Sequence, residues 1–273
     1  MPQVFVEGTV RHVDERSVSV FYRLEGEEGA PVLMFANSLG TDMDLWDEQV
    51  PEFAATLRVL RYDMRGHGRS PEVPGEYTVA ELAADALRVL DALGIERVHF
   101  CGLSLGGMVG QYLGAHHPDR LASLTLCATA CRIGTREVWD ERIALVLGRD
   151  TTAVVDLVIP NWFTERFRQA EPRRVEAIRE MLLNARPLGY AGCCAAVRDA
   201  DLCGDLARIA VPTFCIAGRH DPVTPPERLE EIRERVRDPR GLAVLEAAHL
   251  VNVEARAAFN DALGRFLAEV GAL

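Results

Sequence analysis

The stretch Gly102-Leu-Ser-Leu-Gly106 decides the fold, because it stands between an apolar run that predicts a strand, residues 97–101, and a segment that predicts a helix. A tight turn from strand to helix places its central residue in an uncommon backbone conformation, and the neighbours must be small where chains approach. The flanking glycines meet that need, so Ser104 is predicted to be a nucleophile on this turn. The alternative is a glycine-rich turn with an incidental serine. The turn also aims the N–H of Leu105, at a helix N-terminus, toward an oxyanion.

A serine hydroxyl needs a base, and on such a turn its partners are expected in the chain order serine, acid, histidine. His249 follows the last predicted strand in a loop that could return over the sheet edge, and we assign it as the base. Asp221 ends a strand before a proline, on a rigid turn suited to orient an imidazole, although it could instead be a turn cap. His220 better fits a half-exposed turn residue. Asp205 and Asp238 are weaker candidates because neither ends a recognisable strand.

A second oxyanion donor is expected from the loop after the apolar strand at residues 32–36. That loop is Asn37-Ser-Leu-Gly-Thr41, and we assign the role to the backbone N–H of Leu39. The first two residues of the loop are expected to shape it rather than to react. His67 lies in a second glycine-rich loop and invites a catalytic role. Its flanking glycines and early position favour a structural hydrogen bond instead.

Strand patterns alternate with helix patterns along most of the chain, which predicts an α/β fold with a mostly parallel central sheet flanked by helices. Residues 137–208 break this alternation, because they hold several amphipathic helical stretches and no convincing strand. Strand patterns then return at residues 212–217, so we expect a helical insertion into one sheet. The predicted division is a core of residues 1–132 and 209–273 and a helical lid of residues 133–208.

Composition excludes several classes of protein. The 273 residues carry a formal net charge of -11, and all 30 basic residues are arginine because the sequence contains no lysine. Mechanisms that need a lysine amine, such as Schiff-base and P-loop chemistry, are therefore excluded. The acidic balance and the absence of a dense arginine run argue against a nucleic-acid partner. The longest uncharged run, Val98–Pro118, holds too many glycines and polar residues for a membrane span.

The seven cysteines are odd in number and form no CxxC pair, so neither a disulfide framework nor a zinc knuckle is predicted, and we expect reduced thiols. The start of the chain, Met1–Arg11, lacks the basic and apolar segments of a secretory signal. These two observations favour a cytoplasmic protein. The sequence shows neither a metal-ligand spacing nor a dinucleotide fingerprint, so the expected chemistry uses no metal and no cofactor.

These motifs resemble those of the α/β-hydrolase superfamily and, within it, the 3-oxoadipate enol-lactonases of bacterial aromatic catabolism. The wider resemblance rests on the serine turn, the loop Arg65-Gly-His-Gly-Arg-Ser70, Asp221 and His249, and it covers nearly the whole chain. Leu105 departs from the methionine that many relatives carry, which matters little because its backbone N–H acts. The narrower resemblance rests on stretches outside the serine, acid and histidine: Asn37-Ser-Leu-Gly-Thr-Asp42, Phe100-Cys-Gly-Leu-Ser104, Arg132-Ile-Gly-Thr-Arg-Glu-Val-Trp139, Asn161-Trp-Phe-Thr164, Gly189-Tyr-Ala-Gly-Cys-Cys194 and Asp199-Ala-Asp-Leu202.

The resemblance implies an α/β-hydrolase fold that hydrolyses a small carboxylated enol lactone to 3-oxoadipate, in the beta-ketoadipate pathway, without a cofactor. Two alternatives remain at this point. Another cofactor-free carboxylesterase, lactonase or perhydrolase-like enzyme would share the serine, acid and histidine and differ in the lid. A ligand-binding signalling protein of the same fold would keep these residues and turn over slowly. The oligomeric state is open, and a homo-oligomer is possible.

A carboxylated substrate in a protein of negative net charge calls for a local cation. Arg132 stands where the predicted lid begins and is the first candidate, with a surface ion pair to Glu137 or Asp140 as the alternative. Trp139 and Trp162 could line the pocket from the lid. Aromatic residues at helical spacing also fit a core role.

Overall fold

A mostly parallel sheet forms the centre of the computed structural model, which describes residues 4–12 and 18–273. Its strands are β1 (Val4–His12), β2 (Val18–Gly26), β3 (Val32–Ala36), β4 (Arg58–Tyr62), β5 (Val98–Leu103), β6 (Leu121–Cys127), β7 (Thr213–Gly218) and β8 (Pro239–Leu245). The eight strands follow the order β1-β2-β4-β3-β5-β6-β7-β8, and only the pairs β1–β2 and β2–β4 are antiparallel. The predicted α/β fold class is confirmed.

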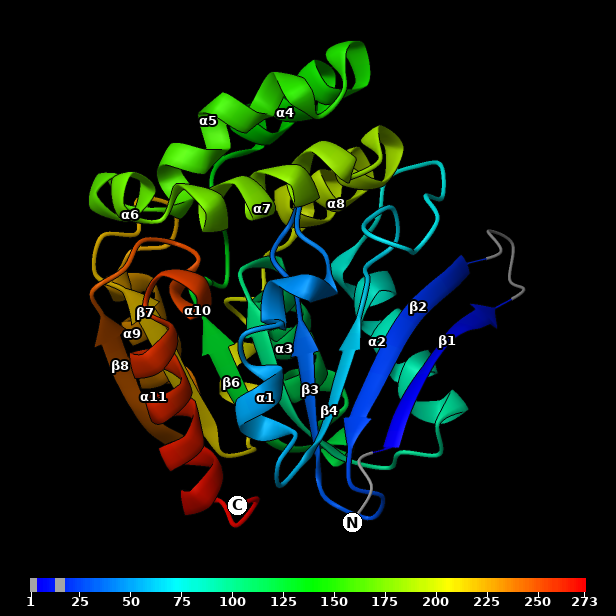
Figure 1. The fold of residues 1–273 in the computed structure, drawn as a ribbon, viewed down its shortest axis with the longest axis vertical. Helices are drawn as coiled ribbons and strands as arrows, with labels where there is room; N and C mark the ends of the chain where they lie inside the picture. The colour runs from blue at the N-terminus through cyan, green and yellow to red at the C-terminus, as the bar shows by residue number, and fades with distance from the viewer. Residues whose placement is uncertain (1–3, 13–17) are drawn as a thin grey trace.

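Helices flank the sheet on both sides (Figure 1). Those outside the insertion are α1 (Val50–Phe53), α2 (Val79–Ala92), α3 (Leu105–His116), α9 (Pro226–Arg235), α10 (Val251–Glu254) and α11 (Arg256–Glu269), with single 3-10 turns at η1 (Met43–Trp46), η2 (Pro118–Arg120) and η3 (Leu206–Arg208). In Figure 1, α1 and α11 lie in front of the sheet, and α2 and α3 lie behind it. Within the described residues, none of the helices has the length and apolar character that a membrane crossing requires.

Five further helices lie between β6 and β7, where the sequence predicts an insertion. They are α4 (Arg136–Arg149), α5 (Thr152–Trp162), α6 (Glu165–Ala170), α7 (Pro172–Asn184) and α8 (Pro187–Asp199), called the cap helices below. Figure 1 shows them stacked above the sheet, beyond the carboxyl ends of β3, β4 and β6. Loops at that edge therefore face the underside of the cap helices.

Local sequence explains the regular elements. All five residues of β3 are buried, as its continuous apolar run predicts. Helix α2 begins with a capping box between Thr78 and Glu81 and ends just before Gly94, which has φ +65°. Strand β1 has no counterpart in the sequence predictions, because it pairs only with β2 at the sheet edge and leaves Phe5 and Val6 exposed. Of the stretch Met1–Arg11, the first three residues lie outside the described part.

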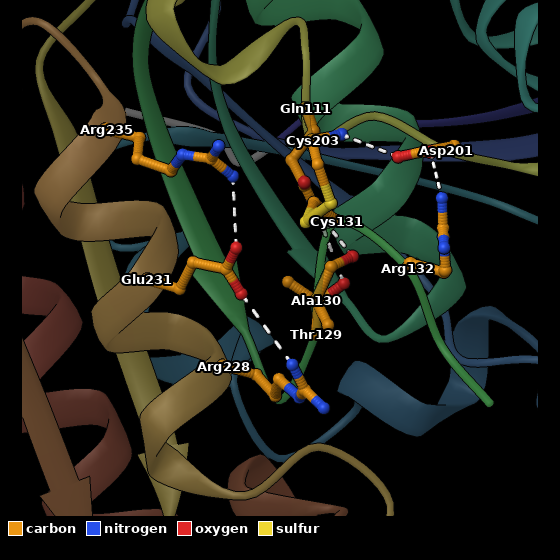
Figure 2. Close-up of a disulfide and its surroundings, with 10 residues drawn as sticks. All are labelled: Gln111, Thr129, Ala130, Cys131, Arg132, Asp201, Cys203, Arg228, Glu231 and Arg235. Carbon is orange, nitrogen blue, oxygen red and sulfur yellow. Dashed lines mark hydrogen bonds and ion pairs between the residues drawn. A yellow bond between two sulfur atoms is a disulfide. The ribbon is translucent and has the colours of Figure 1, made fainter.

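The expectation of seven reduced thiols is wrong for one pair: Cys131 and Cys203 form a disulfide with a Cα–Cα distance of 4.9 Å (Figure 2). The two cysteines are 72 residues apart, and the cap helices lie between them, so sequence spacing gives no signal. The fold brings the entry to the cap helices beside their exit, where Leu202 N–H donates to the Cys131 carbonyl at 3.0 Å. The disulfide removes the cysteine argument for a cytoplasmic location. The remaining cysteines are free and buried: Cys101, Cys127, Cys193, Cys194 and Cys215.

Candidate active site

The turn between β5 and α3 carries Ser104 with φ 57° and ψ −113°, a left-handed backbone that side-chain-bearing residues rarely adopt. Two close approaches explain the glycines around it. A Cβ on Gly102 would come 2.1 Å from the carbonyl oxygen of Gly106, and a Cβ on Gly106 would come 2.3 Å from that of Ala36. Only glycine fits either position without movement of the backbone, so the sequence motif follows from sterics.

Neighbouring strands hold the serine turn in place. Ser104 N–H donates to the carbonyl of Cys127 at 2.9 Å, and Thr129 Oγ1 donates to the carbonyl of Ser104 at 2.8 Å. Gly106 N–H donates to the carbonyl of Asn37 at 3.0 Å. The Asn37 side chain itself donates to the carbonyl at the end of β4 and accepts from a buried indole N–H. Asn37 therefore shapes its loop, in the role that the sequence analysis expects.

The predicted acid and base are hydrogen-bonded to each other. Asp221 Oδ2 accepts from His249 Nδ1 at 2.7 Å, and both side chains are almost fully buried. The other partners of the carboxylate are the N–H groups of Val223 and Thr224 on Oδ1 and the Thr224 hydroxyl on Oδ2. Burial alone would raise the pKa of Asp221, but the charge of His249 and the hydrogen bonds from His249 and Thr224 outweigh it and lower the pKa. Asp221 is therefore an anion that fixes the imidazole.

The loop that carries Leu39 is fastened by His67. Gly40 N–H donates to His67 Nε2 at 3.0 Å, and Nδ1 lies 3.1 Å from the carbonyl of Arg65, so the neutral ring carries its proton on Nδ1. Burial lowers the pKa of His67 to about 4, which keeps the ring neutral. His67 thus makes the structural hydrogen bond that the sequence favours. Within residues 4–12 and 18–273, the N–H groups of Leu39 and Leu105 donate to no other group.

A pocket of about 220 Å³ opens between the serine turn and the cap helices. Ser104 and His249 both line it, and no hydrogen bond joins these two side chains in the described part of the chain. Such bonds between nucleophile and base commonly tighten only in the substrate complex. Trp139 from α4 and Trp162 from α5 also line the pocket, at the position that a lid would give them. The remaining lining residues are Ser38, Leu39, Ile133, Gly134, Val138, Arg142, Val158, Asn161, Tyr190, Val197, Pro222 and Val223.

The assignment of Arg132 as the cation of the pocket needs correction. Its side chain is 62% exposed and pairs with Asp201 rather than with the pocket or with the acidic residues of α4 (Figure 2). Arg142 lines the pocket in its place, with its guanidinium carbon 4.9 Å from the centre of the Trp139 ring. The signal available in the sequence was spacing: Arg142 stands three positions after Trp139, so both share one face of α4.

Arg142 also acts on Tyr190, another buried residue of the pocket. Burial is the main cause that raises the pKa of Tyr190, and the charge and hydrogen bond of Arg142 only partly oppose it. The tyrosine therefore stays protonated. Among the ion pairs of the described ranges, none uses Arg142, so its hydrogen bond to the neutral tyrosine leaves its charge without an acidic partner in the pocket.

The competing candidates lie outside the pocket. His220 is 53% exposed and faces Glu246 at 3.1 Å, whereas Asp205 and Asp238 each pair with an arginine, Arg208 and Arg240. Their surroundings are those of solvated turn residues, which is the role expected for His220.

Potential metal ligands gather at one place in the part of the chain that the structure describes. The group consists of Cys131, Cys203 and Glu231, whose ligand atoms lie within 4.8 Å of one another. Figure 2 shows Glu231 between two arginines of α9, Arg228 and Arg235. Because the disulfide uses both sulfurs, this group offers no thiolate to a metal.

The model of the alpha/beta hydrolase fold family matches residues 31–202. A 3-oxoadipate enol-lactonase of Acinetobacter baylyi is 37% identical over 91% of this chain and 92% of its own length. The enol-lactonase structure from Burkholderia xenovorans LB400 is 38% identical with a TM-score of 0.90, covering 92% and 97% of the two chains. A hydrolase structure from Pseudomonas aeruginosa PA01 is 43% identical with a TM-score of 0.91, covering 95% and 98%. This chain belongs to the alpha/beta hydrolase fold family.

Proposed function

We propose that this chain hydrolyses 3-oxoadipate enol-lactone to 3-oxoadipate, a step of the beta-ketoadipate pathway. The names of the Acinetobacter and Burkholderia relatives support this substrate, since both are enol-lactonases with more than a third of their residues identical to this chain. The observation that carries the proposal is the meeting of Ser104, His249 and an available cation, Arg142, in one pocket. A nucleophile with its base and a carboxylate-binding group are what this lactone requires.

The proposed reaction starts when Ser104 Oγ attacks the lactone carbonyl while His249 Nε2 takes the serine proton. Collapse of the tetrahedral intermediate breaks the ring C–O bond, and His249 returns the proton to the departing enolate oxygen. The leaving group stays tethered, because it belongs to the same carbon chain as the acyl group. Water activated by His249 then cleaves the acyl-enzyme, and the enol becomes the ketone of 3-oxoadipate.

Two amides are proposed to stabilise the charge of the tetrahedral intermediates. The N–H of Leu105 begins α3 directly after Ser104, and Leu39 stands in the loop after β3 and lines the pocket together with Ser104. Each donor in such a site contributes about 3 kcal/mol to lowering the barrier. Asp221 holds the tautomer of His249 that leaves Nε2 free for the serine.

Arg142 is proposed to bind the substrate carboxylate. A guanidinium recognises a carboxylate through two parallel hydrogen bonds, and stacking on Trp139 restricts its side chain before the substrate arrives. The pocket of about 220 Å³ is smaller than the roughly 300–1,000 Å³ typical of drug-sized ligands, which suits a lactone of about ten heavy atoms.

We also propose that residues 133–208 act as the lid of the pocket and residues 1–132 and 209–273 as the core. Trp139, Arg142 and Trp162 enter the pocket from the cap helices, whereas Ser104 and His249 enter it from the sheet edge. In this division the core supplies the chemistry and the lid selects the substrate.

The deciding experiment follows the ultraviolet absorbance of freshly generated enol lactone after addition of the purified protein, beside Ser104→Ala. Rapid loss that disappears in the variant is the expected result. Cleavage of simple aryl esters without cleavage of the lactone would overturn the substrate and leave a carboxylesterase of the same fold.

A second experiment separates the two arginines near the start of the cap helices. Arg142→Ala is expected to raise KM for the lactone by about a hundredfold and to change kcat much less, because a lost charge-assisted pair of hydrogen bonds costs about 3 kcal/mol of binding. Arg132→Ala is the matched control and should leave KM unchanged. A fall in kcat as large as the rise in KM in Arg142→Ala would point to a structural role instead.

A further inference from the structure

The loop that carries His249 is held from both sides of the histidine. Ala248 N–H donates to Glu254 Oε2 at 3.0 Å, and Leu250 N–H donates to the carbonyl of Trp162 at 3.1 Å. Asp221 fixes only one ring nitrogen of His249. The direction in which the other nitrogen, Nε2, points therefore depends on the two hydrogen bonds that the backbone of this loop donates. One of them is accepted by the side chain of Glu254, which lies outside the predicted catalytic residues.

The same carboxylate of Glu254 also holds the cap helices. Its Oε2 accepts from Thr164 N–H at 3.1 Å, and its Oε1 accepts from the Thr164 hydroxyl. Thr164 is the N-cap of α6, where its hydroxyl oxygen accepts from Phe167 N–H, and it stands two residues after the pocket residue Trp162. One side chain thus joins the loop of the base to the segment that lines the roof of the pocket.

We propose that Glu254 is a positioning residue that sets the orientation of His249 and couples it to the seating of the cap helices. An ionised carboxylate suits this task, because its two oxygens together accept several N–H and O–H groups in charge-assisted bonds. The inference rests on the proposed role of His249 as the base. A displacement of about 1 Å at such a base costs a hydrolase up to about a hundredfold in rate, so a bond to the neighbouring amide matters for catalysis.

The surroundings of Glu254 make the proposal testable. Glu254 lines an open cleft of about 630 Å³ between α6 and the loops of the sheet edge, so a substitution there removes no packed core. Glu171 lines the same cleft, and in the described ranges its side chain makes no hydrogen bond to Ala248 or Thr164. Glu171→Gln therefore removes the same charge from the same cleft and serves as the matched control for Glu254→Gln.

The experiment measures kcat, KM and the rate at which a fluorophosphonate labels Ser104 in both variants. In labelling, Ser104 Oγ bonds to phosphorus, fluoride leaves and His249 takes the serine proton, so the rate reports the base without a substrate carboxylate. Glu254→Gln keeps one acceptor oxygen and loses the other. We expect its kcat and labelling rate to fall together by at least about tenfold with KM within about twofold, and Glu171→Gln to match the parent.

Thr164→Val tests the bridge from the side of the cap helices, and it decides the matter should Glu254→Gln fail to fold. It is expected to lower the labelling rate by itself and to add little in the Glu254→Gln background, because both changes break one bridge. A lower thermal midpoint with unchanged kcat and labelling rate in Thr164→Val or Glu254→Gln would overturn the proposal. All rates are measured on an aryl ester as well as the lactone, so failure of the lactone alone rejects the proposed substrate and leaves this test standing.

Discussion

The cap helices join the rest of the molecule at two places that differ in kind. At the neck, residues 131–133 and 201–203, the chain enters and leaves the cap helices through a disulfide, a backbone hydrogen bond and an exposed ion pair (Figure 2). At the clasp, residues 162–164 and 248–254, the contacts are hydrogen bonds beside His249. The covalent attachment joins the two ends of the cap helices, and the non-covalent one lies beside the predicted base. We therefore expect the neck to contribute mainly to stability and the clasp mainly to catalysis.

Loss of the disulfide is expected to have the largest effect on stability. Cys131 and Cys203 close a loop with a sequence separation of 72, and the chain-entropy relation gives about 4 kcal/mol of unfolding free energy for such a loop. Replacement of both cysteines by alanine should lower the free energy of unfolding by that amount and leave kcat unchanged. Urea unfolding and steady-state rates measure the two quantities.

Treatment of the unmodified protein with a reductant provides the control, because the other cysteines are buried and free. It should reproduce the stability loss of the double variant. A fall in kcat that accompanies the fall in stability would show that the neck also positions the pocket, and the contrast with the clasp would fail.

A fall in pH from 6.5 to 4 is expected to lower the free energy of unfolding through His67, beside the pocket, and to leave the contacts of the neck unchanged. The pKa of His67 is lowered from 6.5 to about 4 in the folded protein, so between these values the unfolded chain binds the extra proton. Stability from this residue is complete above pH 6.5 and falls by about 3 kcal/mol as the pH drops toward 4. Asp221 has a lowered pKa, so its contribution is lost only as the pH falls below 3.8. Urea midpoints at a series of pH values measure the loss.

His67→Gln should remove the share of the slope that His67 contributes between pH 6.5 and 4, read as the difference from the parent, since glutamine can accept from Gly40 N–H and does not titrate in this range. The variant without Cys131 and Cys203 should keep the slope of the parent at a lower overall stability. A steeper slope in that variant would mean that the neck and the pocket do not respond independently.

The smallest effect is expected from the ion pair at the neck. Arg132 and Asp201 are at least half exposed, and exposed pairs of this kind contribute about 0.5 kcal/mol. Arg132→Ala should change the free energy of unfolding by no more than about 1 kcal/mol at physiological salt. A larger loss that disappears in the variant without the disulfide would show that the ion pair acts through the geometry of the neck.

Features set by local sequence were the ones that could be predicted. The run of β3, the cap signals of α2 and the glycines around Ser104 each follow from residues that are neighbours in the chain, and the order of Ser104, Asp221 and His249 follows from the strand ends. The predictions that failed concern features that depend on packing between distant segments. The Cys131–Cys203 pair and the position of Arg142 require knowledge of how the cap helices close on the sheet edge.

The bridge through Glu254 is of the same distant kind, since it joins α10 to a segment 90 residues earlier. The sequence analysis missed strand β1 for another reason. It lies at the edge of the sheet and presents exposed apolar residues, so its pattern lacks the alternation that marks a half-buried strand.

The disulfide has a topological consequence, because it turns the cap helices into a closed covalent ring on the sheet. A protease that cuts any one peptide bond between Cys131 and Cys203 would release neither piece, since both ends stay linked through sulfur. The nicked protein would migrate as one chain until it is reduced and as two fragments afterwards. Through that ring, the walls that Trp139 and Trp162 contribute to the pocket stay joined to the serine turn after the backbone above it has been cut.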